Sequence, residues 1–213
     1  MQEAVEKIFK VKKRPNDNPL IVHLSRAEEI SKVADTSDAL VTKRLKLLES
    51  LWPGPLSVVL DKLEHVPDNV SAGLPSIAVR VPDNPIALKL LKLSGVPIAA
   101  PSANISGYIS PTKAEHVMEL ANEVDYILTG DDCKIGLEST VLDIRNEKPA
   151  ILRPGHYSRK YLSEILKEEV TLLSENSKTL SASPGTRHTH YCPTVPLIPV
   201  SYTHLTLPTT PSV

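Results

Sequence analysis

Short aliphatic, β-branched segments alternate with helical segments along most of the chain, and proline or glycine bounds many of them. This alternation favours an α/β fold. The connection Asp143–Pro149 is too short for a crossover between parallel strands, so we expect a mixed sheet. The expected strands are Pro19–Leu24, Leu56–Leu60, Ser76–Val81, Val96–Ala100, Tyr126–Leu128, Thr140–Ile144 and Ala150–Leu152. The expected helices are Ala4–Lys13, Ala39–Leu51, Asn84–Leu93, Ala114–Glu123 with a cap near Thr112, and Arg159–Glu169.

Length and composition restrict the class of protein. The 213 residues suffice for one domain and an appendage, and no apolar run is long enough to cross a membrane. The net charge of −1 argues against a protein that grips nucleic acid over its whole surface, although a local basic patch stays open. The two cysteines, Cys133 and Cys192, do not suggest a disulfide framework. We therefore expect a cytoplasmic protein that is not embedded in a membrane.

The two ends of the chain differ from its centre. The first helical pattern begins almost at Met1, with no preceding strand. From Thr171 to about Pro196 the composition is that of a linker. Val195–Val200 has the pattern of an opening strand, whereas Thr203–Val213 is rich in Thr and Pro and shows no period. We expect residues 1–169 to form the main domain, 170–195 a linker, and 196–213 a stub of a second domain with a non-native tail.

Three arginines lie in or next to expected strands. Arg14 follows a basic helix end that includes Lys12, Arg80 lies inside an aliphatic strand, and Arg153 ends a strand before Pro-Gly. Guanidinium groups in such places suit phosphate or carboxylate ligands. Two alternatives stay open from the residues alone. Cations also favour a helix C-terminus, and Arg80 fits the exposed side of an edge strand.

Polar turns rich in hydroxyl groups also lie next to the expected strands. The most informative is Ala99–Gly107, in which Ser102, Asn104 and Ser106 stand among small residues that let a ligand approach the backbone. Ser110 begins the following helix, whose free amides suit an anion, and Ser139 precedes a strand. An ordinary polar turn would also explain this composition. Together with the arginines, these turns predict a site for a polyanionic ligand.

Standard catalytic and cofactor motifs are missing from the sequence. It contains no Walker A loop, no dinucleotide-binding glycine fingerprint, no nucleophile elbow and no paired Cys-x-x-Cys. The run His188–Cys192 alternates residues that can bind metal. A structural zinc site needs four ligands and no second cluster accompanies this run, so zinc is disfavoured and no metal ligands are assigned.

In this order, the motifs resemble the threonylcarbamoyl-AMP synthase family of YrdC-like proteins, over roughly Gln2 to Pro196. The residues that carry the resemblance are Lys12-Lys13-Arg14-Pro15, Asn18-Pro19-Leu20 with His23, Pro101 to Gly107, Glu138 to Val141, Leu152 to Gly155, and Ser183 to Pro193. The resemblance implies a twisted mixed sheet flanked by helices, with a concave nucleotide-binding face. An extended linker would then cover the active site.

The resemblance also implies roles for individual residues. Lys12 and Arg14 would be catalytic. ATP would contact Arg14, Asn18, Ser76, Ser102, Asn104, Ser110, Arg153 and, from the linker, His190 and Tyr191. Threonine would contact His23, Arg80, Ala100 and Ser139.

The implied reaction joins L-threonine, bicarbonate and ATP into threonylcarbamoyl-AMP and pyrophosphate, with Mg²⁺, for tRNA modification. tRNA or proteins of tRNA modification are the implied partners. Family members carry an N-terminal strand–turn region with a Pro-Thr-x-Thr-x-Tyr-Gly-Leu motif, which this sequence lacks. We therefore expect a truncated fragment with weak or no activity. The alternatives are a YrdC-like protein that binds double-stranded RNA or tRNA without catalysis, and a carbamoyl-phosphate-processing relative, which the Ser183–Pro193 linker disfavours.

Overall fold

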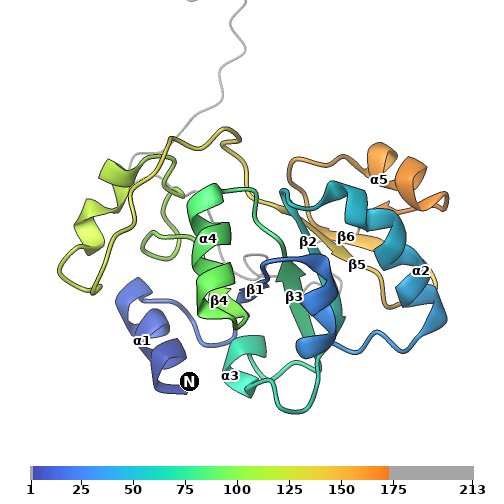
Figure 1. Ribbon diagram of the computed structural model, residues 1–213, viewed down its shortest axis with the longest axis horizontal. Coiled ribbons are helices and arrows are strands. Elements are labelled where there is room, and N and C mark those ends of the chain that lie inside the picture. The colour runs from blue at the N-terminus through green and yellow to red at the C-terminus, as the bar shows by residue number, and fades with distance from the viewer. Residues whose placement is uncertain (1, 173–213) are drawn as a thin grey trace, which may run out of the picture.

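A computed structural model describes residues 2–172, whose strands form one mixed sheet (Figure 1). The strand order is β4-β1-β3-β2-β5-β6-β7. Neighbours pair in parallel in β1–β3, β2–β5 and β6–β7, and antiparallel in the other three pairs. The strands are β1 (Ile21–His23), β2 (Leu56–Asp61), β3 (Ser76–Arg80), β4 (Ile98–Ala100), β5 (Thr140–Asp143), β6 (Ala150–Arg153) and β7 (Thr171–Leu172).

The helices begin with the capping residues that helix propensities favour. Asp38 accepts hydrogen bonds from two amides at the start of one α-helix, and Asn84 does the same at another, which has Pro85 in its first turn. The α-helices are α1 (Gln2–Lys12), α2 (Ala39–Leu48), α3 (Asp68–Ser71), α4 (Pro85–Ser94) and α5 (Arg159–Leu166); the 3₁₀ helices are η1 (Ala27–Lys32), η2 (Glu49–Leu51) and η3 (Ala114–Leu120).

The two faces of the sheet differ because strand side chains alternate. Val22, Val79 and Leu142 point to the main core, where they join residues of α1, α2 and α5. The alternate positions, among them Ile21 and Ala78, form a smaller apolar cluster made of strand residues alone. The described helices contribute to the core on the first face and not to the cluster on the second.

Most predicted elements are confirmed within a few residues, but the predicted strand Tyr126–Leu128 is wrong. Residues 121–139 contain no strand. Tyr126 is 88% exposed and Leu128 60% exposed, so this segment packs on no sheet. A strand forms only with a pairing partner, and in the described part of the chain β4 pairs with β1 alone. The apolar composition therefore predicted a strand at a place where the described residues offer no second strand to pair with.

Two further expectations need correction. The predicted helix Ala114–Glu123 is the 3₁₀ helix η3, and its N-cap is Lys113, which makes no capping hydrogen bond, rather than Thr112. Without a cap, the first amides of a helix are poorly satisfied. Thr171 and Leu172, predicted as the start of a linker, pair in parallel with β6 as β7. The predicted segments from residue 173 onward lie outside the described residues.

No helix in the part of the chain that the structure describes is long and apolar enough to cross a membrane.

Candidate anion-binding site

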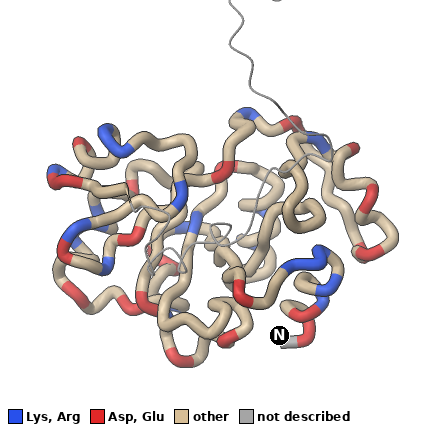
Figure 2. Tube along the Cα trace, turned by 180° about the vertical axis from the view of Figure 1, so that it is seen from behind, with Lys and Arg blue, Asp and Glu red and all other residues tan. Residues whose placement is uncertain are grey.

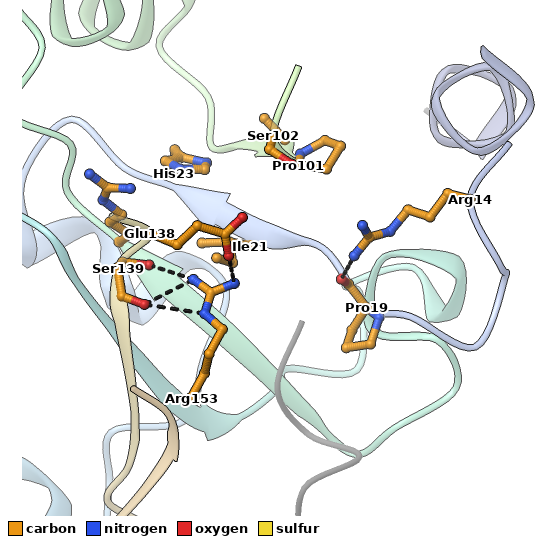
Figure 3. Close-up of a pocket in the computed structure, with 11 residues that line it drawn as sticks. Arg14, Pro19, Ile21, His23, Pro101, Ser102, Glu138, Ser139 and Arg153 are labelled. Carbon is orange, nitrogen blue, oxygen red and sulfur yellow. Dashed lines mark hydrogen bonds and ion pairs between the residues drawn. The ribbon is translucent and has the colours of Figure 1, made fainter. Parts of the chain in front are cut away.

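A cavity of about 160 Å³ opens on the face of the sheet that carries the smaller apolar cluster (Figure 3). It collects residues from the segment between α1 and β1, from β1, β3, β4 and the loop after β4, from the turn before β5, and from β6. Its lining residues are Arg14, Pro19, Ile21, His23, Arg80, Ala100, Pro101, Ser102, Glu138, Ser139 and Arg153. Three guanidinium groups and a single carboxylate are thus found among the described lining residues.

The end of α1 places Arg14. Lys13 takes a left-handed conformation with φ of 50°, which ends the helix, and the Arg14 amide donates to the Phe9 carbonyl at 2.9 Å. The guanidinium donates to the carbonyls of Asn18 at 3.2 Å and Pro19 at 2.8 Å. Burial is the main cause that lowers the pKa of Arg14, to about 10. The turn before β1 therefore holds a charged, nearly buried guanidinium at the cavity wall.

Strand register places His23 and Arg80 side by side. They are direct partners in the parallel pair β1–β3, so both side chains leave the same face. The Arg80 Nε donates to the Gly54 carbonyl at 3.0 Å. Burial first, and Arg153 second, lower the pKa of Arg80. The alternative of an exposed edge-strand arginine is excluded, because β3 lies between β1 and β2.

A β-bulge turns Arg153 toward the cavity. Regular alternation would place Arg153 with Ile151, which packs in the main core under the helices. The register between β5 and β6 shifts at Val141/Leu142, so that Arg153 lies opposite Val141, on the cavity side of the sheet. Bulges commonly re-aim a side chain in this way. The shift gives the cavity its third guanidinium.

Arg153 is held by the turn before β5. Its Nη2 donates to the Ser139 carbonyl at 2.9 Å and to the Ser139 hydroxyl at 3.0 Å, and its Nη1 lies 2.5 Å from a Glu138 oxygen (Figure 3). The Ser139 hydroxyl also lies 2.8 Å from that of Ser57. The other Glu138 oxygen accepts from the Ser110 hydroxyl at 3.0 Å. A network of five side chains therefore fixes this end of the cavity.

Lys12 orders the loop that follows β4. Its ammonium donates to the carbonyls of Ser102 and Asn104, and its own carbonyl accepts from the Ser106 amide at 2.9 Å. Burial, followed by the charge of Arg14, lowers the pKa of Lys12 to about 8. Lys12 does not itself line the cavity. It instead fastens the loop that brings Ser102 there.

The predicted site residues fall into three groups. The cavity wall contains Arg14, His23, Arg80, Ala100, Ser102, Ser139 and Arg153. Lys12, Asn18, Ser76, Asn104 and Ser110 do not line the cavity; of these, Asn18 contacts Arg14 through its carbonyl and Ser110 contacts Glu138. His190 and Tyr191 lie outside the described residues.

Glu138 is the lining residue that sequence reasoning missed as a site residue. Its signal was available, since three arginines in one pocket need a counter-charge and Glu138 adjoins Ser139 in a turn already selected. Pro19, Ile21 and Pro101, which form apolar walls, were also not assigned.

We expect acid to destabilise the protein through His23. Burial first, and Arg80 second, lower the pKa of His23 to about 4 from the ordinary 6.5. Between these values the unfolded chain binds more protons, so the free energy of unfolding falls as the pH drops from 6.5 to 4. The expected loss from this group between pH 7 and pH 5 is about 2 kcal/mol. Urea unfolding of the wild type and of His23→Gln at both pH values measures it.

His65→Gln is the matched control, because His65 is exposed and outside the cavity. The His23→Gln variant should lose about 2 kcal/mol less than the wild type over this pH interval, and His65→Gln should lose as much as the wild type. Equal pH dependence in all three proteins would contradict the assignment.

Comparison with known proteins identifies relatives of this chain. The family model Sua5/YciO/YrdC, described as "Telomere recombination", matches residues 1–155. The threonylcarbamoyl-AMP synthase of Bacillus subtilis is 42% identical over 200 residues, which cover 92% of this chain and 56% of the relative. That of Pyrococcus abyssi is 40% identical over 203 residues, covering 93% and 58%. The chain thus spans little more than half the length of these relatives.

Solved structures agree with the fold. A crystal structure of P. abyssi Sua5 complexed with L-threonine superposes with a TM-score of 0.83 at 40% identity, over 90% of this chain and 56% of that one. Escherichia coli YciO, at 24% identity and a TM-score of 0.66, shares the fold. The match of the family model over most of the chain, together with the identities near 40%, shows that this chain belongs to the Sua5/YciO/YrdC family.

Proposed function

We propose that the chain forms the substrate site of a threonylcarbamoyl-AMP synthase, which makes threonylcarbamoyl-AMP and pyrophosphate from L-threonine, bicarbonate and ATP. The observation that carries the proposal is the convergence of Arg14, Arg80 and Arg153 on one cavity with the Ser102 and Ser139 residues. Such a group of cations and hydroxyls suits the phosphates of a nucleotide and the carboxylate of an amino acid. The names of the relatives, and threonine bound in one of them, agree.

The reaction consists of two bond-forming steps. The threonine ammonium gives up a proton to become the free amine, and bicarbonate takes up a proton and loses water to give CO₂. The amine attacks this CO₂, and loss of a further proton from the nitrogen leaves the carbamate. A carbamate oxygen then attacks the α-phosphorus of ATP, and the bond to the β-phosphate oxygen breaks to release pyrophosphate. Positioning and fixed positive charge are the means by which proteins accelerate such a step. The buried guanidiniums would stabilise charge on the phosphoryl group.

The proposed contacts divide between two ligands. Arg14 and Arg153, at the ends of α1 and β6, would hold the nucleotide together with Asn18, Ser76, Ser102, Asn104 and Ser110. Asn104 Oδ1 and Ser106 Oγ are buried without a hydrogen-bond partner among the described residues, which favours a ligand beside this loop. His23, Arg80, Ala100 and Ser139 would hold threonine. Lys12 would act by fixing the loop and adding positive field.

In this proposal magnesium would enter the site bound to the phosphates of ATP. Among the described residues no group of three or more His, Cys, Asp or Glu is placed to hold a metal, and the one carboxylate of the cavity is paired with Arg153. Mg²⁺ is usually held by one or two carboxylates together with substrate phosphates. No step is therefore assigned to a metal held by these residues alone.

The proposed acceptor of the threonylcarbamoyl group is tRNA. We place the reaction in the cytoplasm, where ATP and tRNA occur. Figure 2 shows Lys and Arg interspersed with Asp and Glu along the trace of the described chain, whereas a broad basic surface would need the cations to gather on one side. A protein that holds RNA over a large area needs such a surface. The charge distribution therefore favours a small-molecule site over RNA binding without catalysis.

The proposal is tested by ligand binding and turnover. Calorimetry on this chain should detect ATP and L-threonine, and pyrophosphate release should require both threonine and bicarbonate. Arg14→Ala and Arg153→Ala should each raise the Kd for ATP about tenfold or more, equivalent to about 1.4 kcal/mol. Arg26→Ala is the control, because Arg26 is exposed and outside the cavity. A chain that binds neither ligand, or an unchanged Kd in both cavity variants, would contradict the proposed function.

A further inference from the structure

Glu138 is the one carboxylate among the described residues that line the cavity. Figure 3 shows its side chain extending into the cavity between the Pro101–Ser102 segment and Arg153. One oxygen lies 2.5 Å from Arg153 Nη1, and the other accepts from the Ser110 hydroxyl at 3.0 Å. An ionised carboxylate offers about four lone-pair positions, so each oxygen retains capacity for a further donor.

Orienting Arg153 does not require Glu138. Three hydrogen bonds already fix that guanidinium to Ser139, two of them to its carbonyl and one to its hydroxyl. Besides supplying counter-charge to the three guanidiniums, the Glu138 carboxylate is therefore able to bind a ligand. The free lone pairs of Glu138 suit a ligand that carries a hydrogen-bond donor.

Three carbonyls at the cavity wall already accept hydrogen bonds, and a neutral acceptor cannot balance a positive charge as a carboxylate does. The carbonyls of Pro19, Ser102 and Ser139 accept hydrogen bonds from Arg14, Lys12 and Arg153, respectively. His23 is neutral at pH 7, because burial and Arg80 lower its pKa to about 4. The charged groups among the described lining residues are three guanidiniums and Glu138, so a cationic group of a ligand finds an opposite charge there at Glu138.

We propose that Glu138 receives the α-ammonium group of the amino-acid substrate and so makes the cavity select an amino acid over the corresponding acid without the amino group. This inference rests on the proposed function, since it concerns the threonine part of the same site. The carboxylate of the amino acid then has guanidiniums to pair with, while its ammonium has Glu138. The positive ammonium and the negative carboxylate of the ligand each meet a group of opposite charge in the cavity.

The test compares L-threonine with 3-hydroxybutyrate, which is threonine without its amino group, by calorimetry at pH 7. The wild type should bind threonine at least tenfold more tightly than 3-hydroxybutyrate. Glu138→Gln, which keeps the size and an acceptor for Ser110, should weaken threonine binding about tenfold and leave 3-hydroxybutyrate binding unchanged or tighter. Glu64→Gln, an exposed residue outside the cavity, should keep the wild-type preference.

Each outcome decides the matter. Equal affinity of the wild type for the two ligands overturns the inference without any variant, which covers the case that Glu138→Gln does not fold. Parallel weakening of both ligands in Glu138→Gln also overturns it, because that result indicates a role in positioning Arg153. A wild-type chain that binds ATP but neither acid contradicts the threonine part of the proposed function as well. Retained binding of threonine with unchanged preference in Glu138→Gln contradicts the inference alone.

Discussion

Replacing Arg44 with methionine is expected to lower the free energy of unfolding by about 3–5 kcal/mol. Arg44 lies on α2 and its side chain is fully buried. Its guanidinium donates to the carbonyls of Ile144, Asn146 and Glu147 and to both oxygens of Glu168, at 2.6 to 2.8 Å. All five donors are thus used, and methionine would leave three carbonyls without their donor. Urea unfolding at pH 7 measures the loss.

Two variants separate the causes of this loss. Glu168→Gln removes the charge of a side chain that is 29% exposed, so water can replace part of the interaction and the loss should be about 1–2 kcal/mol. Arg44→Lys keeps the charge but not the planar fork, so its loss should fall between those of Arg44→Met and Glu168→Gln. A loss below about 1 kcal/mol in Arg44→Met would show that the network contributes little.

The second large effect is expected from Gly155→Ala, which should cost about 3 kcal/mol of stability and also weaken ATP binding more than tenfold. A Cβ at residue 155 would lie 2.5 Å from the Glu138 carbonyl oxygen, 2.7 Å from the Ser139 carbonyl carbon, and closer still to the Thr140 amide nitrogen. All three are backbone atoms, so the segment must move as a whole. That segment holds Arg153, and the cavity would lose its shape along with the packing.

Gly136→Ala is the matched control for this prediction. The same methyl group at residue 136 would meet no heavy atom of the described residues within 4 Å, and the residue precedes the same turn. Thermal unfolding and calorimetry with ATP should give wild-type values for Gly136→Ala and reduced values for Gly155→Ala. Similar stability in the two variants would mean that the Glu138–Thr140 segment yields at little cost.

Much of the fold followed from local pattern. The strands that form the centre of the sheet are β-branched runs with clear proline or glycine limits, so periodicity located β1, β2, β3 and β5 to within three residues at either end. The short connection before Ala150 predicted the antiparallel pair β5–β6. The site followed in part for the same reason, because Arg14, Arg80 and Arg153 stand where strands begin or end.

What the sequence could not provide depends on contacts between distant residues. The bulge that re-aims Arg153 arises from the pairing of β6 with β5, and no single-strand pattern signals it. The role of Lys12 in holding the Ser102 and Asn104 carbonyls joins residues some 90 positions apart. The pairing of Glu138 with Arg153 and Ser110 likewise joins residues from separate segments, although the need for a counter-charge was readable from the arginines.

The two faces of the sheet have a consequence for how such a protein can change over time. In β1, Val22 belongs to the main core, whereas its neighbours Ile21 and His23 line the cavity; in β3, Val79 belongs to that core and Arg80 to the cavity. Selection for folding and selection for ligand preference therefore act on alternate positions of the same strand. Substitutions on the cavity side can retune what is bound while the scaffold stays intact, so one family can acquire different substrates without rebuilding its interior.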